Sequence, residues 1–188
     1  MGFFDEEAGI KQYLEMVEGV DGKRWVDLLA KFLSPGATVL ELGMGPGKDL
    51  DLLAERYVAT GSDSSQLFLD RYRTLHPQAD LLKLDAVTID TDRRFDGIYS
   101  NKVLHHLPRT ALPHSLARQQ QVLAPAGIVL HTFWLGTGQM EHHGLLFTYY
   151  SEAELRELVD LHFEILAAIT YRELEDEDSL GLVLKSRL

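Results

Sequence analysis

Apolar residues recur at helical spacing near the start of the chain and then gather into short runs. Residues 7–33 hold apolar positions three and four apart, interrupted near Gly19–Gly22 and ended by Ser34-Pro35-Gly36, which predicts two helices. Thr38–Leu42 is a short apolar run with β-branched members that enters a glycine-rich turn. Helical spacing returns from Leu50 to Ala54. This stretch therefore predicts a strand, a loop and a helix in that order.

The same order repeats along the middle of the chain. Strands are predicted at Tyr57–Gly61, Ala79–Leu84, Phe95–Ser100 and Ile128–Trp134, with helices at Leu67–Leu75 and Leu112–Leu123. Strands joined by helical crossovers predict an α/β fold in which a mostly parallel, doubly wound sheet has helices on both faces. Ligands bind such sheets at the carboxyl ends of the strands, so polar residues at those ends are the candidates for function.

The C-terminal part of the chain departs from this alternation. Ser151–Leu161 predicts a helix, with Ser151 as its N-cap and Glu154 completing a capping box. The strands predicted at Phe163–Tyr171 and Leu180–Ser186 have only a loop between them, and two strands joined in this way must be antiparallel. We therefore expect a seven-stranded sheet that ends in a C-terminal antiparallel hairpin.

Length and composition indicate a single domain. The chain has 188 residues, is 45% hydrophobic and 25% charged, and shows no internal repeat or linker. We expect one domain over residues 1–188, in which residues 1–35 form an N-terminal helical cap and residues 36–188 form the core.

Net charge and targeting signals restrict the possible partners. A formal net charge of -11 argues against direct binding to nucleic acids, because such binding relies on clustered Lys and Arg. No apolar run approaches the roughly 20 residues needed to span a bilayer, and Asp5, Glu6 and Glu7 stand where a signal peptide would be basic. The chain has no cysteine, which excludes disulfides and thiolate metal sites. We expect a cytoplasmic protein with no membrane contact, while its oligomeric state stays open.

The segment Glu41-Leu42-Gly43-Met44-Gly45-Pro46-Gly47 lies between the first core strand and its helix, where a doubly wound sheet accepts a nucleotide-like ligand. Alternating glycines permit positive φ and a close approach of the backbone to that ligand. A dinucleotide fingerprint requires Gly-x-Gly-x-x-Gly, but Lys48 stands in place of its third glycine, so NAD fits poorly. Asp63 follows the second strand, where a carboxylate can accept hydrogen bonds from ribose hydroxyls in either class of cofactor.

Five segments, in this order along the chain, resemble the motifs of class I S-adenosylmethionine-dependent methyltransferases. They are Val39–Gly47, Thr60–Ser65, Leu84–Ala86, Phe95–Asn101 together with Val103–Leu107, and Val122–Gly127. The sequence departs from the family at Ala126, where a second glycine is common. The resemblance implies a Rossmann-like fold, S-adenosyl-L-methionine as cofactor, S-adenosyl-L-homocysteine as product, and methyl transfer by in-line displacement.

The resemblance also implies which residues hold the cofactor. Asp63 would bind the ribose, Asp85 would accept from the adenine amino group, and Tyr13 would cover the methionine end, since related enzymes close the site with an N-terminal helix. As local features alone, Asp63 would be a turn residue and Asp85 a helix cap. The full predicted cofactor set is Tyr13, Glu41, Gly43, Gly45, Gly47, Asp63, Ser64, Asp85, Ala86, Ser100 and Asn101.

Residues that follow the fourth and fifth strands are candidates for the acceptor side. His105 and His106 titrate near neutrality and would serve as a general base if the acceptor must lose a proton. Trp134, Tyr149 and Tyr150 would form an aromatic wall of the substrate pocket, although they are equally suited to the core.

A metal site is not expected from the remaining histidines. No further ligands stand at the usual spacing from His131 or from the group Glu141, His142 and His143. Adjacent residues on a loop rarely form a tetrahedral site unaided.

The leading hypothesis is a methyltransferase that acts on a small-molecule acceptor. Two alternatives stay open at this point. One is a methyltransferase that modifies a tRNA base together with a partner subunit that supplies a basic face. The other is a non-catalytic S-adenosylmethionine-binding regulatory protein, because fold alone does not guarantee turnover.

Overall fold

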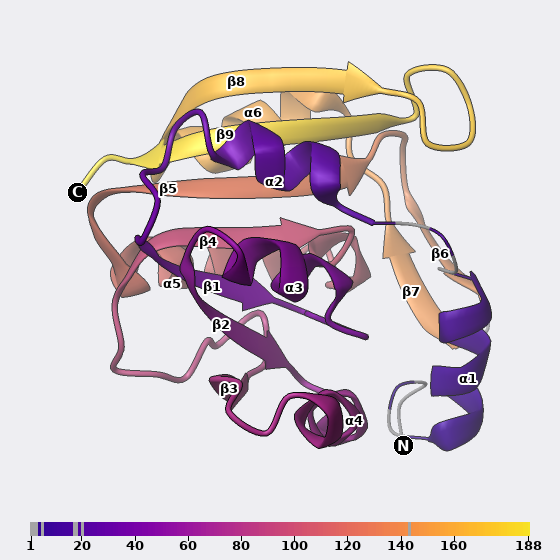
Figure 1. Cartoon of the computed structure of the whole chain (residues 1–188). Coiled ribbons are helices and arrows are strands. Elements are labelled where there is room, and N and C mark those ends of the chain that lie inside the picture. The colour runs from indigo at the N-terminus through magenta and orange to yellow at the C-terminus, as the bar shows by residue number, and fades with distance from the viewer. Residues whose placement is uncertain (1–3, 5, 17–18, 20, 143) are drawn as a thin grey trace.

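A seven-stranded sheet forms the centre of the molecule in the computed structural model, which describes residues 4, 6–16, 19, 21–142 and 144–188 (Figure 1). Its order is β3-β2-β1-β4-β5-β9-β8. The strands are β1 (Thr38–Leu42), β2 (Val58–Asp63), β3 (Leu81–Lys83), β4 (Phe95–Asn101), β5 (Leu123–Trp134), β8 (Phe163–Tyr171) and β9 (Ser179–Ser186). Strands β1 to β5 pair in parallel, whereas β9 is antiparallel to both β5 and β8. The predicted fold class, including the C-terminal hairpin, is confirmed.

Helices cover both faces of the sheet because alternate strand residues point to opposite sides. Val39 packs in one apolar cluster with Trp25 and Leu53, while its neighbour Leu40 packs in another with Leu116. Figure 1 accordingly shows α2 and α3 on one face and α5 and α6 on the other. The helices are α1 (Glu7–Met16), α2 (Lys23–Leu29), α3 (Lys48–Ala54), α4 (Gln66–Leu75), α5 (Leu112–Val122) and α6 (Glu152–Asp160), with a 3-10 turn, η2, at Leu104–His106. Among the described residues, no helix is long and apolar enough to cross a membrane.

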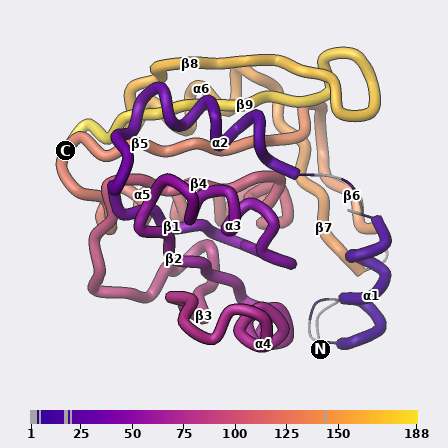
Figure 2. Tube along the Cα trace, in the orientation of Figure 1, coloured from indigo at the N-terminus to yellow at the C-terminus, as the bar shows by residue number. Residues whose placement is uncertain are grey.

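The two N-terminal helices play different parts. Within the segment predicted as a cap, residues 1–35, α2 packs on the sheet beside α3, whereas α1 stands at the edge to which the parallel strands point (Figure 2). Residues 1–3, 5, 17, 18 and 20 of this segment lie outside the described residues.

A small hairpin, β6 (Gln139–His142) and β7 (Leu145–Thr148), forms a separate two-stranded sheet that the sequence pattern did not predict. Each strand has only four residues, and Gly136, Gly138 and Gly144 adopt positive φ around them, so the stretch carries a turn signal rather than a strand signal. The hairpin lies at the carboxyl end of the sheet, at the same end as α1 (Figure 1). It therefore adds a wall to the edge where a ligand is expected.

The junction of α5 and β5 also differs from the prediction. The structure begins β5 at Leu123, which pairs with Phe95 ahead of a register shift, instead of at Ile128. Ala126 lies in this shift with φ of 59°, a conformation that favours glycine. The departure from the family pattern at Ala126 thus falls on a strained turn, far along β5 from the strand's carboxyl end.

Helix α2 is seated by a close contact with a glycine of β9. A Cβ placed on Gly181 would overlap the Trp25 indole, so the ring lies directly on the strand backbone. Trp25 also contacts Tyr171 edge to face, with ring centroids 4.6 Å apart. The missing side chain at Gly181 is therefore what lets α2 approach the sheet.

We expect Gly181→Ala to lower the free energy of unfolding by about 1–3 kcal/mol, because the added methyl overpacks the Trp25 ring. Chemical denaturation measures the effect. Combining Gly181→Ala with Trp25→Leu should cost less than the sum of the two single changes, since the smaller side chain makes room. Additive costs in this double-mutant cycle would show that the two residues do not press on each other.

Candidate active site

The glycine loop between β1 and α3 is fixed to the end of β2 by backbone hydrogen bonds. Gly43, Gly45 and Gly47 have φ of 68°, 49° and 85°, as the alternating pattern predicted. The Met44 N–H donates to the Ser62 carbonyl at 2.8 Å, and the Gly45 N–H donates to Asp63 Oδ2 at 2.9 Å. A side chain at Gly45 would point at the Tyr13 ring, 3.6 Å away. The loop thus keeps a bare backbone surface beneath α1.

Asp63 is positioned by backbone donors at the end of β2. Its Oδ1 accepts from the Ser65 N–H at 2.8 Å, while Gly45 occupies one side of Oδ2. Burial raises the pKa of Asp63, and the backbone N–H groups of Ser65, Gly45 and Ser64 oppose that rise. Each carboxylate oxygen keeps further acceptor capacity, so the predicted role toward ribose hydroxyls is still available to it.

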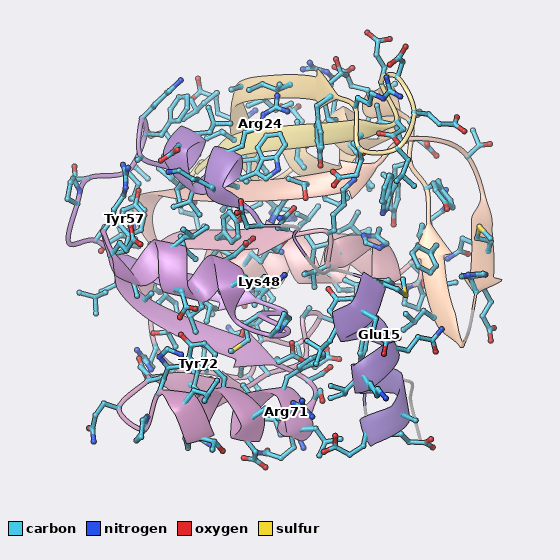
Figure 3. The ribbon with its side chains drawn as sticks, turned by 45° about the vertical axis from the view of Figure 1, so that its right-hand side comes forward. Glu15, Arg24, Lys48, Tyr57, Arg71 and Tyr72 are labelled. Atoms are coloured by element: carbon cyan, nitrogen blue, oxygen red, sulfur yellow. The ribbon has the colours of Figure 1, made fainter. Side chains whose placement is uncertain are left out.

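One cavity of about 360 Å³ opens beside this loop at the carboxyl edge of the sheet. Figure 3 turns α1 to the front, where Glu15 labels it, with Lys48 labelling the start of α3. Seven of the residues predicted from the sequence line the cavity: Tyr13, Glu41, Gly43, Asn101, His105, His106 and Trp134. The structure therefore brings the cofactor and acceptor candidates into a single space.

Carboxylates dominate the cofactor end of the cavity. Glu41 is 3% exposed, and its Oε2 has no hydrogen-bond partner within the described part of the chain. Burial raises the pKa of Glu41 well above its ordinary value, and Asp49 and Asp63 add to the rise. Burial and the same acidic neighbours raise the pKa of Tyr13 to about 12. This end is built to receive a positive charge or a hydrogen-bond donor.

Asp49, which the sequence analysis missed, connects the N-terminal segment to this end. Its Oδ1 accepts from the Gly22 N–H at 2.6 Å. Its Oδ2 accepts from Tyr99 Oη at 2.7 Å and Asn101 Nδ2 at 3.1 Å. The only sequence signal was an acidic residue in the first turn of α3, which is common enough to pass as a favourable helix-dipole interaction.

Two adjacent imidazoles, with their planes inclined at 46° to each other, form the acceptor end. The rings of His105 and His106 lie 3.9 Å apart, and Phe147 of β7 packs against both. His106 Nδ1 lies 2.7 Å from the Leu146 carbonyl oxygen. A carbonyl only accepts, so Nδ1 carries the proton and the lone pair of the neutral ring is on Nε2.

Burial lowers the pKa of both imidazoles. For His106 the hydrogen bond to Leu146 opposes the effect, whereas for His105 the charges of His106 and Lys102 reinforce it. Both rings are therefore neutral at pH 7, and each can act as a hydrogen-bond partner. His106 in addition has a defined tautomer that can take up a proton.

Lys102, also missed, places a cation at the acceptor end. Its Nζ donates to the Phe133 carbonyl at 3.2 Å and to Ser179 Oγ at 2.7 Å, and lies 3.5 Å from the Trp134 ring centroid. Burial lowers the pKa of Lys102 to about 8, against the charges of Glu173 and Asp178. Its φ of 54° is unusual for a residue with a side chain, and such strain concentrates at functional sites. Its position directly after β4 was the available signal.

Several predicted residues lie elsewhere. The Tyr150 side chain is fully buried in the core, and neither it nor Tyr149 lines the cavity. The two-residue period of β7 instead turns Leu145 and Phe147 toward it. The Ser100 hydroxyl points into the core, and Asp85 Oδ1 accepts from the Val87 and Thr88 N–H groups as a local cap. Gly45, Gly47, Asp63, Ser64 and Ala86 also lie outside the set that lines the cavity.

Within the described residues, no group of three or more His, Asp or Glu side chains is arranged to hold a metal ion. His143 lies outside those residues, and the buried His131 ring is hydrogen-bonded to Ser100 and Gln119.

Comparison with known proteins matches residues 39–127 to a family described as a methyltransferase domain. Trans-aconitate 2-methyltransferase of Azoarcus sp. (strain BH72) is 36% identical over 109 residues, which is 55% of this chain and 42% of that protein. The same enzyme of Rhizobium rhizogenes is 37% identical over 86 residues, 44% of this chain and 34% of that protein. The chain thus spans less than half the length of these curated relatives.

Solved structures share the fold over nearly the whole chain. A 1,6-didemethyltoxoflavin-N1-methyltransferase from Burkholderia thailandensis, with bound 1,6-didemethyltoxoflavin and S-adenosylhomocysteine, has a TM-score of 0.80 at 21% identity, covering 95% of this chain and 84% of that one. A TehB-like S-adenosylmethionine-dependent methyltransferase from Corynebacterium glutamicum has a TM-score of 0.77 at 18% identity, and the match covers 97% of this chain and 100% of that one. By its motifs and these matches the chain is similar to class I S-adenosylmethionine-dependent methyltransferases, and its sheet order is that of the solved structures that share its fold.

Proposed function

We propose that this protein transfers a methyl group from S-adenosyl-L-methionine to a small-molecule acceptor. The observation that carries the proposal is one cavity that joins the glycine loop and the Glu41 carboxylate, whose Oε2 has no partner among the described residues, to the neutral pair His105 and His106. One end of this space suits a cationic cofactor. The other end suits an acceptor that needs a partner for its proton.

The residues at the cofactor end fit S-adenosylmethionine on the chemistry of their charges. That cofactor carries two positive charges, an ammonium and a sulfonium, and supplies the methyl group on the sulfonium. Glu41 Oε2, buried and without a partner among the described residues, is suited to accept from the ammonium. Asp49 and Asp63 add negative charge to the same end. A phosphate-bearing dinucleotide would meet repulsion there instead.

The acceptor must be small. Drug-sized ligands occupy pockets of roughly 300–1,000 Å³, and this cavity of about 360 Å³ is at the low end of that range, so beside the methionine end of the cofactor it admits only a small molecule or one protruding group. Lys102 favours an acceptor with an anionic group, because it is the cation at that end. The curated relatives are named for trans-aconitate, so small carboxylic acids are the first acceptors to test.

His106 is the residue suited to remove a proton from the acceptor. An acceptor O–H or N–H would give its proton to Nε2, while the oxygen or nitrogen takes the methyl group and the sulfonium becomes a thioether. An ionised carboxylate has no proton to lose, and in that case the imidazoles only orient it. Trp134 and Phe147 exclude water from the space in which the groups meet.

We expect S-adenosylhomocysteine to bind with micromolar affinity and Asp63→Ala to weaken binding about 10- to 100-fold, through loss of charged hydrogen bonds of ~1.5–3 kcal/mol. Isothermal titration measures this. Asp80→Ala is the matched control, because Asp80 pairs with Thr60 and Arg93 outside the set that lines the cavity. Equal loss in both variants would remove Asp63 from the site, and tighter binding of NAD would refute the proposed cofactor.

Glu41 should release a proton when the cofactor binds. Its raised pKa keeps the buried carboxyl protonated in the free protein above pH 4.5, and a bound ammonium favours the ionised form. Affinity for S-adenosylmethionine should therefore rise with pH from about 5 upward. Titration at pH 6 in buffers of different ionisation enthalpy should report the released proton. Its persistence in Glu41→Gln would assign it to another group.

His106→Asn should lower kcat at least tenfold for an acceptor with an O–H or N–H nucleophile and much less for an ionised carboxylate. In the wild type, activity on the protic acceptor should rise with pH to a plateau, with its midpoint below the ordinary histidine value of about 6.5, because burial lowers the pKa of His106 and only the neutral ring takes a proton. His162→Asn, near the far end of α6, is the control. A kcat loss equal for both acceptor types would make His106 a packing residue.

A further inference from the structure

A chain of buried polar side chains crosses the core between β4 and the segment after β3. Ser100 Oγ lies 2.7 Å from His131 Nδ1, and His131 Nε2 lies 2.7 Å from Gln119 Oε1. Gln119 Nε2 donates to Ser115 Oγ at 3.1 Å, and Ser115 Oγ donates to the Ala86 carbonyl at 2.6 Å. All four side chains belong to residues with 0% exposure. We call Ser100, His131, Gln119 and Ser115 the buried relay.

Every proton in the buried relay has a determined place. The Ala86 carbonyl only accepts, so the Ser115 hydroxyl donates to it and accepts from the Gln119 amide. The Gln119 carbonyl oxygen then faces His131, whose Nε2 must donate. His131 Nδ1 is left to accept from the Ser100 hydroxyl. Burial lowers the pKa of His131 to about 3, which agrees with this neutral tautomer at working pH.

Stability alone does not require such an arrangement. A fully satisfied buried network contributes little more to folding than apolar side chains of the same volume, but it specifies one geometry. Apolar residues surround the relay on this face of the sheet, including Leu116 and Val129. The relay therefore fixes the position of the backbone group at its end, the Ala86 carbonyl, more closely than apolar packing would.

The group that it fixes belongs to the predicted adenine side of the site. Arg118, also on α5, donates to the carbonyls of Thr88, Ile89 and Thr91, so α5 holds this segment at two points. Asp85 caps the same turn through Oδ1 alone. Among the described residues, no hydrogen bond engages the Ala86 N–H. The segment thus presents an acceptor, the Asp85 carboxylate, next to a free donor, the Ala86 N–H.

We propose that the buried relay positions Ala86 so that the segment reads the base of the cofactor; this rests on the proposed function. Adenine offers an amino donor beside a ring-nitrogen acceptor, which complements Asp85 and the Ala86 N–H. Hypoxanthine offers a carbonyl acceptor beside a ring N–H, the reverse polarity. Gln119 and Ser115 are therefore positioning residues for base selectivity, and neither touches the cofactor.

The test compares Gln119→Met with Gln120→Met. Gln120 is the next residue of α5, and its amide exchanges hydrogen bonds with the His162 carbonyl and ring, away from the cavity. Isothermal titration gives Kd for S-adenosylhomocysteine and S-inosylhomocysteine with each variant, and a thermal melt gives Tm. In the wild type we expect at least 30-fold preference for the adenine ligand.

We expect Gln119→Met to reduce this preference at least fivefold and Gln120→Met to leave it within twofold, whatever their Tm values. A purely structural role would shift Tm without changing the ratio of the two Kd values, and an unchanged ratio overturns the inference. If Gln119→Met does not fold, Ser115→Ala decides in the same way, because it removes the donor to Ala86 together with the acceptor of the Gln119 amide by a smaller change in side-chain volume. A wild type that binds neither ligand refutes the proposed function instead.

Discussion

Buried carboxylates that accept backbone N–H groups hold the carboxyl edge of this sheet together. Where parallel strands end, the backbone must turn without a neighbouring strand to satisfy its donors. Asp63 takes the Gly45 and Ser65 N–H groups, and Asp49 takes the Gly22 N–H. Burying a carboxylate is costly unless it is hydrogen-bonded, and these donors offset much of that cost.

The same buried carboxylates set the electrostatics of the site. Asp49 and Asp63 fix the loop and the N-terminal segment, but they also raise the pKa of Glu41, whose buried Oε2 has no hydrogen-bond partner among the described residues. Lys102, His105 and His106 stand at the other end, where the imidazoles are kept neutral. A cationic cofactor would therefore relieve repulsion at one end, while Lys102 at the other end is close to the opposing charge of Glu173. The polarity of the cavity follows from how the backbone is held.

The sequence predicted the scaffold well because scaffold signals are local. Thr38–Leu42 became β1 with the predicted bounds, and the capping box of Ser151 and Glu154 formed as expected. The contributions of Asp49 and Lys102 were not predictable, since each depends on partners about 30 to 80 residues away. In the structure Phe147 lines the cavity in place of the predicted Tyr149 and Tyr150. The residues of a strand that face a ligand can be chosen only when the position of the strand is known, and the short β7 strand was not predicted.

Access to the cavity depends on the unequal anchoring of the first two helices. Helix α2 buries Trp25, Val26 and Leu29 against the sheet, whereas α1 contributes Ile10 as its buried residue. Tyr13 of α1 nevertheless covers Gly45, at the point where a ligand must approach the loop backbone. Because apolar burial scales with area removed from water, displacing α1 costs less than displacing α2. The fold thus places the described helix with the fewest buried residues over the glycine loop and keeps the acidic end of the cavity on β1, β2 and the start of α3.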